Sequence, residues 1–436
     1  MKYVDEFRDG ATARGIAARI AAELQPGRRY SFMEFCGGHT HAIARYGIAE
    51  LLPPEVRMIH GPGCPVCVLP IGRIDQAIAL ALERGVILAT YGDTMRVPAS
   101  PAAVGPPQGA GSPLGGQTPQ APRGQQEGLS LMRAKARGAD IRMVYSAADA
   151  LALARAHPQR EVVFLAIGFE TTTPPTALVI RQAAKEGLAN FSVLCCHVLT
   201  PSAITHILES AEVRQYGTVP IDGFIGPAHV SIIIGSAPYA HFAEEYRKPV
   251  VIAGFEPLDV MQAVLMLVRQ VNDGRAEVEN EFIRAVTPEG NLAAQAVVSE
   301  VFELRERFEW RGLGEVPYSA LKLRPAFARF DAERRFALTY KPVPDHKQCE
   351  CGAILRGVKR PTDCKLFGTV CTPDNPMGSC MVSSEGACAA HYSYGRFRDI
   401  PVVGASACGP SAGPLPSRPA IPLGDRPVYP PVEGQT

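Results

Sequence analysis

The segment VVFLAIGFETTTPPTALVIRQAA, residues 162–184, contains the repeating unit that decides the fold. The apolar run Val162–Ile167 predicts a buried strand, Gly168–Pro174 predicts a polar loop, and Ala177–Ala184 predicts a helix. The same succession recurs along the chain, with further strands predicted at Tyr30–Phe35, Val56–His60, Val86–Tyr91, Ile141–Tyr145, Phe191–Cys196, Gly223–Ile225 and Val250–Ala253, and helices at Gly15–Leu24, Arg73–Glu83 and Leu258–Val271. Alternating strands and amphipathic helices are typical of α/β proteins with parallel sheets.

Eight predicted strands exceed what one small sheet requires. We therefore expect two parallel-sheet α/β domains, residues 1–138 and 139–272, followed by a third domain over 273–408. The pattern of this third domain is helical up to Phe336 and rich in Gly, Pro and Cys after Tyr340. Residues 98–124 hold 13 Pro or Gly among 27 residues and predict a flexible insertion, and the Pro-rich residues 409–436 predict a disordered tail.

The composition excludes several classes of protein. The 436 residues carry 44 basic and 43 acidic side chains and are 46% hydrophobic, which argues against a disordered polyelectrolyte and against a dedicated nucleic-acid binder. No apolar run approaches the roughly 18 residues of a membrane span, and the first residues lack the apolar region of a signal peptide. We expect a cytoplasmic protein that binds neither nucleic acid nor membrane.

Twelve cysteines in a cytoplasmic chain indicate metal binding or redox chemistry, because that compartment keeps thiols reduced. One group lies near the N-terminus at Cys36, Cys64 and Cys67. A second group lies within forty residues near the other end, at Cys349, Cys351, Cys364, Cys371, Cys380 and Cys388. The distribution predicts two separate sites. Cys195 and Cys196 lie within an apolar strand and are interpreted as core residues.

Polar and glycine-rich motifs follow five of the predicted strands directly, at residues 36–41, 61–67, 168–174, 196–197 and 226–231. The carboxyl ends of parallel strands lie on one side of a sheet, where ligands bind. We therefore expect these loops, with their histidines 39, 41, 60, 197 and 229, to converge on one cleft. Glu170, in the third loop, is as compatible with helix capping as with a functional role.

The pair Cys64-Pro65-Val66-Cys67 lies between a strand and a predicted helix start, where free backbone N–H groups and the helix dipole favour a thiolate. This placement suits a reversible dithiol and disulfide, and the alternative is half of a zinc site. Cys36, separated from His39 by two glycines, suits a soft metal ligand or a nucleophile, and the alternative is a buried strand-end cysteine.

The later cysteines have the spacing Cys349-x14-Cys364-x6-Cys371-x16-Cys388. This spacing lacks the short pairs of zinc ribbons and the compact run of bacterial ferredoxins. Four or more cysteines in a region poor in core residues indicate a metal centre, and the spacing alone leaves zinc and an iron–sulfur cluster equally open.

Five motifs together resemble the HypD family of hydrogenase maturation factors: FMEFCGGHTHAI at Phe32–Ile43, GPGCPVCV at Gly61–Val68, GFETTTP at Gly168–Pro174, GPAHVSI at Gly226–Ile232 and SSEGACAA at Ser383–Ala390. The resemblance spans almost all of residues 30–395. It implies a cytoplasmic scaffold on which the Fe(CN)2CO group of nickel–iron hydrogenases is assembled, in complex with the small chaperone HypC and transiently with the cyanide donor HypE.

The resemblance also implies roles for single residues. Cys36 would be a ligand of the transient iron with His39 beside it, and Cys64 and Cys67 would be the redox dithiol. Glu385 would lie between a cluster and the cleft. The [4Fe-4S] cluster would be held by Cys349, Cys364, Cys371 and Cys388, which leaves Cys351 and Cys380 as non-ligands.

The mechanism we expect is assembly supported by electrons that pass from the cluster through Cys64 and Cys67 toward iron held by Cys36. Two alternatives stay open. The first is a stand-alone thiol–disulfide oxidoreductase that acts on protein disulfides, and the second is a zinc-stabilised binding scaffold without redox activity.

Overall fold

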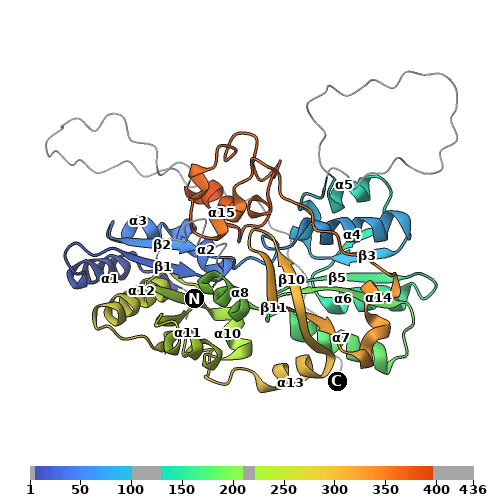
Figure 1. Cartoon of the computed structure of the whole chain (residues 1–436), viewed down its shortest axis with the longest axis horizontal. Coiled ribbons are helices and arrows are strands. Elements are labelled where there is room, and N and C mark those ends of the chain that lie inside the picture. The colour runs from blue at the N-terminus through green and yellow to red at the C-terminus, as the bar shows by residue number, and fades with distance from the viewer. Residues whose placement is uncertain (1–4, 101–128, 210–220, 396–436) are drawn as a thin grey trace, which may run out of the picture. The chain divides into compact units, whose positions relative to one another are not determined.

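Two parallel sheets carry the predicted strands (Figure 1). The computed structural model describes residues 5–100, 129–209 and 221–395. In this part of the chain one sheet has the order β2-β1-β7-β8-β9 and the other the order β4-β3-β5-β6. Their strands are β1 Tyr30–Glu34, β2 Val56–His60, β3 Ile87–Thr90, β4 Ile141–Met143, β5 Val162–Gly168, β6 Phe191–His197, β7 Gly223–Pro227, β8 Val250–Ala253 and β9 Val278–Asn280. The α/β fold class is confirmed, and so are all eight predicted strands.

Helices pack against these sheets and bury the strands between them. Every residue of β5 and β6 is buried, which is why both strands read as continuous apolar runs. The helices are α1 Gly10–Glu23, α2 Gly37–Tyr46, α3 Ile48–Leu51, α4 Ile71–Glu83, α5 Leu131–Ala136, α6 Ala147–Ala156, α7 Thr173–Lys185, α8 Thr200–Glu209, α10 Ala228–Ile234, α11 Ala240–Glu244, α12 Pro257–Asn272, α13 Leu292–Val301, α14 Ala332–Arg335, α15 Cys351–Leu355 and α16 Ala387–Ala390.

The membership of the sheets differs from the order of the predicted domains. β3, which precedes Gly138, pairs with β4 and β5, whereas β7, which follows it, pairs with β1. The boundary expected near Gly138 therefore does not separate the two sheets, because the chain enters the second sheet at β3 and returns to the first at β7. Residues 101–124 of the predicted insertion and the predicted tail 409–436 lie outside the described residues.

The prediction of a helical pattern over 275–336 is wrong for its central part. An antiparallel hairpin of β10, Phe302–Trp310, and β11, Gly314–Leu323, occupies it. Phe302, Phe308 and Trp310 are buried while charged side chains stand between them, so the apolar residues recur with the period of two that is typical of a strand. Helix α13 precedes the hairpin and the short helix α14 follows it.

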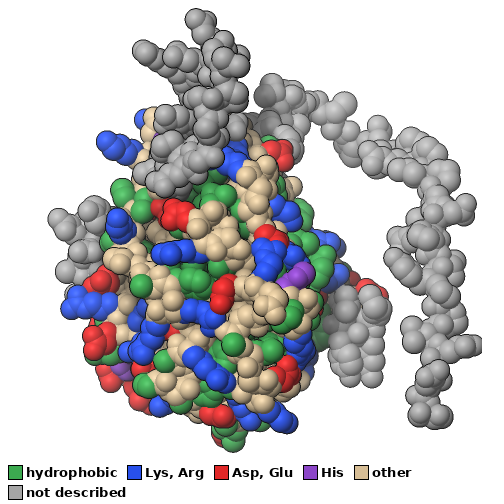
Figure 2. Space-filling view, turned by 90° about the vertical axis from the view of Figure 1, so that its right-hand side faces the viewer, with side chains coloured by type: hydrophobic (Ala, Val, Ile, Leu, Met, Phe, Trp, Pro, Cys, Tyr) green, Lys and Arg blue, Asp and Glu red, His purple; other side chains and the backbone are tan. Residues whose placement is uncertain are grey.

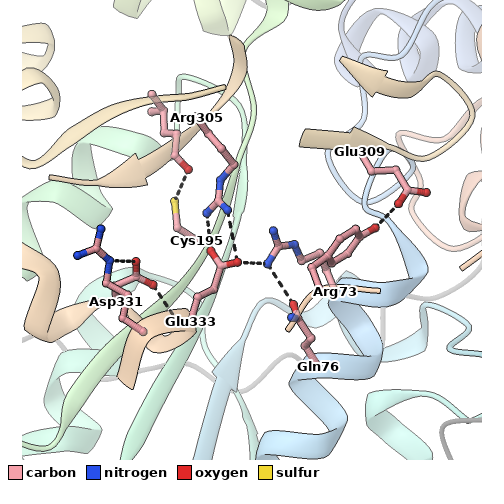
Figure 3. A network of polar contacts seen from close by, with 10 residues as sticks. Arg73, Gln76, Cys195, Arg305, Glu309, Asp331 and Glu333 are labelled. Atoms are coloured by element: carbon pink, nitrogen blue, oxygen red, sulfur yellow. Dashed lines mark hydrogen bonds and ion pairs between the residues drawn. The ribbon is translucent and has the colours of Figure 1, made fainter. Parts of the chain in front are cut away.

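A buried network of charges fixes this hairpin against helix α4 (Figure 3). The Glu333 carboxylate accepts from Arg73 of α4 at 2.6 Å and from Arg305 of β10. The Arg73 guanidinium also lies 4.6 Å from the ring centre of Tyr340. Replacement of Glu333 by Ala would leave both guanidinium groups without this partner, and breaking such a buried ion pair costs about 3–5 kcal/mol. Helix α4, which begins four residues after Cys67, is thus held against the hairpin.

Figure 2 shows basic and acidic side chains interspersed on the face in view, as the near-equal numbers of the two charges lead one to expect. Within the described residues, none of the helices has the length and hydrophobicity that crossing a membrane requires.

Candidate functional site

A cleft of about 320 Å³ lies where strand-end loops of both sheets meet. Four of the five predicted loops contribute to it, and the loop at 196–197 does not. The lining residues are Phe35, Cys36, Gly63, Pro65, Val66, Tyr91, Gly92, Asp93, Ile167, Gly168, Phe169, Thr171, Thr172, His229, Val230, Ser383 and Glu385. The two sheets therefore share one cleft at the carboxyl ends of their strands, as the rule for parallel sheets leads one to expect.

Cys36 stands at the junction of β1 and α2 and lines this cleft. Its side chain is buried, and its backbone N–H donates to Glu34 Oε2 at 2.9 Å. Burial and the nearby Glu385 carboxylate raise the pKa of the Cys36 thiol far above its usual value. The thiol is therefore neutral at physiological pH, and a bound metal ion would have to displace its proton.

Glycines allow the close packing around Cys36. A Cβ atom added to Gly37 would overlap the side chain of Glu385, and one added to Gly63 would overlap the backbone of Cys36. The Gly37 N–H donates to the Gly63 carbonyl at 3.1 Å. The glycines of both loops are thus required by close approach, and they bring Cys36, Glu385 and the loop that carries Cys64 together.

Glu34 organises the same junction and was missed by sequence reasoning. Its carboxylate is fully buried and accepts from the Cys36 N–H, from the Thr40 hydroxyl and from His60 Nδ1, the last at 2.8 Å. Its position was a usable signal, because Glu34 is a carboxylate within an apolar strand, two residues before Cys36. A carboxylate in such a strand is buried only where hydrogen-bond donors pair with it.

His39 lies behind the cleft instead of lining it. Its buried Nε2 donates to the carbonyls of Ala253 at 3.0 Å and Gly254 at 2.9 Å, and Nδ1 has no hydrogen-bond partner. Burial lowers the pKa of His39, so the ring is neutral. The Phe255 ring lies between His39 and His229, with ring centres 4.9 Å and 4.1 Å away, so His229 is the histidine that reaches the cleft.

Other polar residues of the predicted loops have structural partners. His41 contacts the Tyr394 ring, and His197 Nε2 lies 3.0 Å from the Thr176 hydroxyl. Glu170 accepts from the Thr200 N–H at 2.8 Å and from its hydroxyl at 3.1 Å, and burial raises the pKa of Glu170 to about 7. Glu170 therefore ties the start of α8 to the loop after β5.

Cys64 and Cys67 lie together in the loop before α4. Both thiols are free and buried, and the Cys67 N–H lies 3.3 Å from Cys64 Sγ. The expectation that the helix start lowers the thiol pKa is wrong for Cys67. Burial and hydrogen bonds with Cys380 and Cys64 raise the pKa of Cys67.

The later cysteines form a pocket with apolar walls. Cys349, Cys364, Cys371 and Cys388 line it together with Cys351, and the other lining residues are Glu350, Ile354, Leu366, Phe367 and Met381. A Cβ atom added to Gly378 would overlap the sulfur atoms of Cys349 and Cys351. Within the described ranges, no three or more His, Cys, Asp or Glu side chains have the arrangement of a single-ion site.

The two cysteine groups are neighbours, although the sequence predicts separate sites. The Cys380 thiol contacts both Cys351 and Cys67, and these hydrogen bonds lower the pKa of Cys380. The Ser379 hydroxyl donates to the Cys67 carbonyl at 2.6 Å. A Cβ atom added to Gly386 would lie 2.9 Å from Cys67 Sγ. The cysteine-rich segment thus packs directly on the loop of Cys64 and Cys67.

Glu385 lines the cleft and directly precedes Gly386, which packs on Cys67, and Ser383 and Asp93 lie beside Glu385. The Ser383 hydroxyl donates to Asp93 Oδ2 at 2.7 Å, and the Glu385 N–H donates to the Ser383 hydroxyl at 3.3 Å. Burial, followed by the carboxylates of Asp93 and Glu34, raises the pKa of Glu385. Sequence reasoning missed Asp93, although its position just after a predicted strand was the signal used for the other loops.

Comparisons with known proteins find one family and several relatives. A model of the HypD family, described as a hydrogenase formation hypA family, matches residues 11–112 and 121–395. The chain is 75% identical over 405 residues to a hydrogenase maturation factor HypD of Cupriavidus necator, covering 93% of this chain and 100% of that protein. It is 65% identical to the HypD of Rhizobium leguminosarum bv. viciae, with 92% and 97% covered, and 42% identical to that of Escherichia coli K12, with 90% and 98% covered.

Proposed function

The chain belongs to the HypD family of hydrogenase maturation factors, and from this premise we propose that it is the scaffold on which the Fe(CN)2CO group of nickel–iron hydrogenases is assembled. It would work in the cytoplasm with a HypC-type chaperone and a HypE-type cyanide donor. One observation carries the proposal: Cys36 opens into a cleft whose wall, at Pro65 and Val66, is the loop between Cys64 and Cys67. The proposed ligand thiol thus lies in the same cleft as the two residues that separate the cysteines of the dithiol.

The iron under assembly is the cargo of this cleft, and Cys36 would be its ligand. A thiolate is a soft donor that suits iron carrying cyanide and carbon monoxide. The hydrogen bond from the Cys36 N–H to Glu34 fixes the backbone of the ligand. His39 would support the site from behind through its hydrogen bonds to Ala253 and Gly254.

The cysteine pocket fits a [4Fe-4S] cluster by the chemistry of its donors. Cys349, Cys364, Cys371 and Cys388 would hold the cluster, since iron–sulfur clusters take thiolates within an apolar surround. A cluster bound there would supply single electrons. Cys351 lines the same pocket but also contacts Cys380, which favours its role as a neighbour of the cluster over that of a ligand.

The Cys64 and Cys67 pair would link the pocket to the cleft. Reduction of its disulfide takes two electrons and two protons and breaks one S–S bond, giving two thiols. Cys67 contacts Cys380, which in turn contacts Cys351, so a continuous series of sulfur atoms leads from the pocket to the dithiol. Glu385 lies where the cysteine-rich segment meets the cleft and would hold this junction together.

The two alternative functions differ from the proposed one in the thiol exposure or in the metal that they require. A stand-alone oxidoreductase must present a sulfur atom to a protein disulfide, whereas Cys64 and Cys67 are 3% and 0% exposed. Their burial argues against that function. A zinc-stabilised scaffold would use the same pocket, and metal analysis separates it from the proposal.

Iron and sulfide analysis of anaerobically purified protein tests the proposal. We expect wild-type protein, purified with its maturation partners, to contain sulfide, cluster iron and additional cargo iron. Single replacement of Cys349, Cys364, Cys371 or Cys388 by Ala should remove the sulfide, because each supplies a cluster ligand. Cys36→Ala should keep the sulfide and lose only the additional iron.

The matched control is Cys195→Ala, since Cys195 is buried in β6 away from both sites and should leave iron and sulfide unchanged. Stoichiometric zinc without sulfide in the wild-type protein would refute the cluster and favour the zinc-stabilised scaffold.

A further inference from the structure

The turn between β10 and β11 contacts residues next to both cysteine groups. The Arg311 N–H donates to the Val68 carbonyl at 2.8 Å, one residue beyond Cys67. The next residue, Gly312, packs so closely on α15 that an added Cβ atom would overlap Gly352. Helix α15 begins at Cys351, so this turn lies between the dithiol loop and the cysteine pocket.

The side chain of Arg311 is buried at this position and only partly paired. It is 3% exposed, and its Nε and Nη2 atoms both lie 2.5 Å from Asp345 Oδ1. The remaining nitrogen, Nη1, is buried without a hydrogen-bond partner. A buried guanidinium is costly unless its donors are satisfied, so the free N–H groups of Nη1 point to a negatively charged group that completes the environment.

The charges around Arg311 indicate where that group lies. Burial opposes the positive charge, but Asp345 and the thiols of Cys351 and Cys349 outweigh it, and the pKa of Arg311 is raised. The packing of the neighbouring Gly312 on Gly352, next to Cys351, also brings Arg311 near the cysteines that line the pocket. A cluster held by four thiolates carries a net negative charge and presents sulfur atoms that accept hydrogen bonds.

We propose that Arg311 is the fixed cationic partner of the cluster and that it raises the cluster's reduction potential, with Asp345 partly offsetting its charge. The inference rests on the proposed function, since it requires a cluster in the cysteine pocket. Addition of one electron makes the cluster one unit more negative, and a buried positive charge nearby stabilises that reduced form. Arg311 thereby favours electron uptake beside the loop that carries Cys64 and Cys67.

The two partners give effects of opposite sign. R311Q removes a positive charge and should lower the reduction potential of the cluster, whereas D345N removes a negative charge and should raise it. A purely structural role for the ion pair would not produce this reversal, because both variants break the same contact. R311K keeps the charge and should stay near the wild-type potential.

Anaerobic redox titration, followed by electron paramagnetic resonance of the reduced cluster, tests the proposal. For R311Q we expect the equilibrium constant for reduction to fall about tenfold, which corresponds to about 59 mV for one electron. D345N should shift it in the other direction. R307Q is the matched control, because Arg307 lies on the same hairpin in an exposed ion pair with Glu315. The cluster of the R307Q variant should have the wild-type reduction potential.

Each outcome decides a different point. Wild-type protein without iron and sulfide would overturn the proposed cluster itself. An R311Q protein with a full cluster and the wild-type potential would overturn only the role of Arg311. If R311Q fails to assemble a cluster, the redox titration of the D345N variant tests the role of Arg311 instead. A reduction potential in D345N that equals the wild-type value or lies below it would refute the proposal.

Discussion

Single polar residues near the strand ends are buried, and burial sets their protonation. Burial raises the pKa values of both Cys36 and Glu385, and nearby carboxylates add to each shift. The Glu34 carboxylate accepts hydrogen bonds from the N–H group of Cys36, from the Thr40 hydroxyl and from His60 Nδ1. At the residue scale the site therefore combines a buried thiol, Cys36, with the side chains of Glu34, Asp93 and Glu385 close to it.

Glu170 shows how burial links protonation to stability. Its folded pKa of about 7 lies above the ordinary value of 4.5, so ionisation is disfavoured in the folded state. The wild-type protein should therefore lose stability as the pH rises from about 4.5 to 7, by an amount on the order of 3 kcal/mol. Glu170→Gln cannot ionise and can still bond both groups of Thr200, so urea unfolding should show a smaller loss between pH 5 and pH 8.

Glu55→Gln is the control for Glu170→Gln, because Glu55 is exposed and its replacement should leave the wild-type pH dependence unchanged. Parallel loss of stability in Glu170→Gln and the wild type would show that Glu170 does not titrate in this range.

At the scale of the element, the loop of Cys64 and Cys67 is the part of the molecule whose redox state is proposed to change. It connects β2 to α4, and α4 is fixed to the hairpin through Arg73 and Glu333. Pro65 and Val66 face the cleft, while Cys67 contacts Cys380 on the other side. Formation of a disulfide in this loop would therefore affect both the cleft wall at Pro65 and Val66 and the contact with Cys380. Helix α4 would stay in place.

We expect Cys64 and Cys67 to form a disulfide under oxidising conditions, because their two thiol groups are in hydrogen-bond contact. Rapid acid quenching, denaturation, alkylation and mass spectrometry should show the pair converting reversibly as the redox potential of the buffer changes. Cys195 and Cys196 are the internal control, since adjacent strand residues point to opposite faces and should stay reduced. A pair that stays reduced under strong oxidant would remove the electron link from the mechanism.

The elements that could be predicted are those whose pattern is local. β5 and β6 are buried on both faces, so their sequences alone identify them. The short strand β9, with Glu279 and Asn280, has no such pattern and is defined only by its pairing with β8. The hairpin of β10 and β11 replaces the helical pattern predicted for this region, because its buried residues Phe308 and Trp310 are separated by one charged residue in the alternation of a strand.

At the scale of the whole molecule, the site depends on a chain that passes between two sheets. The common cleft could be predicted because the carboxyl ends of parallel strands share one side. The contact of Cys380 with Cys67 could not, since more than 300 residues separate them and only tertiary packing brings them together. The same holds for Arg311, whose role depends on the position of the hairpin turn between Val68 and Gly352.

The central claim is that Cys36 carries the iron group in the cleft, and infrared spectroscopy of the complex with the HypC-type chaperone tests it most directly. We expect bands of iron-bound cyanide and carbon monoxide in the wild type and in Cys195→Ala. Cys36→Ala should fold, because it loses only one small buried group, and should keep the cluster while these bands vanish. Bands of wild-type intensity in folded Cys36→Ala protein would contradict the account and place the iron elsewhere.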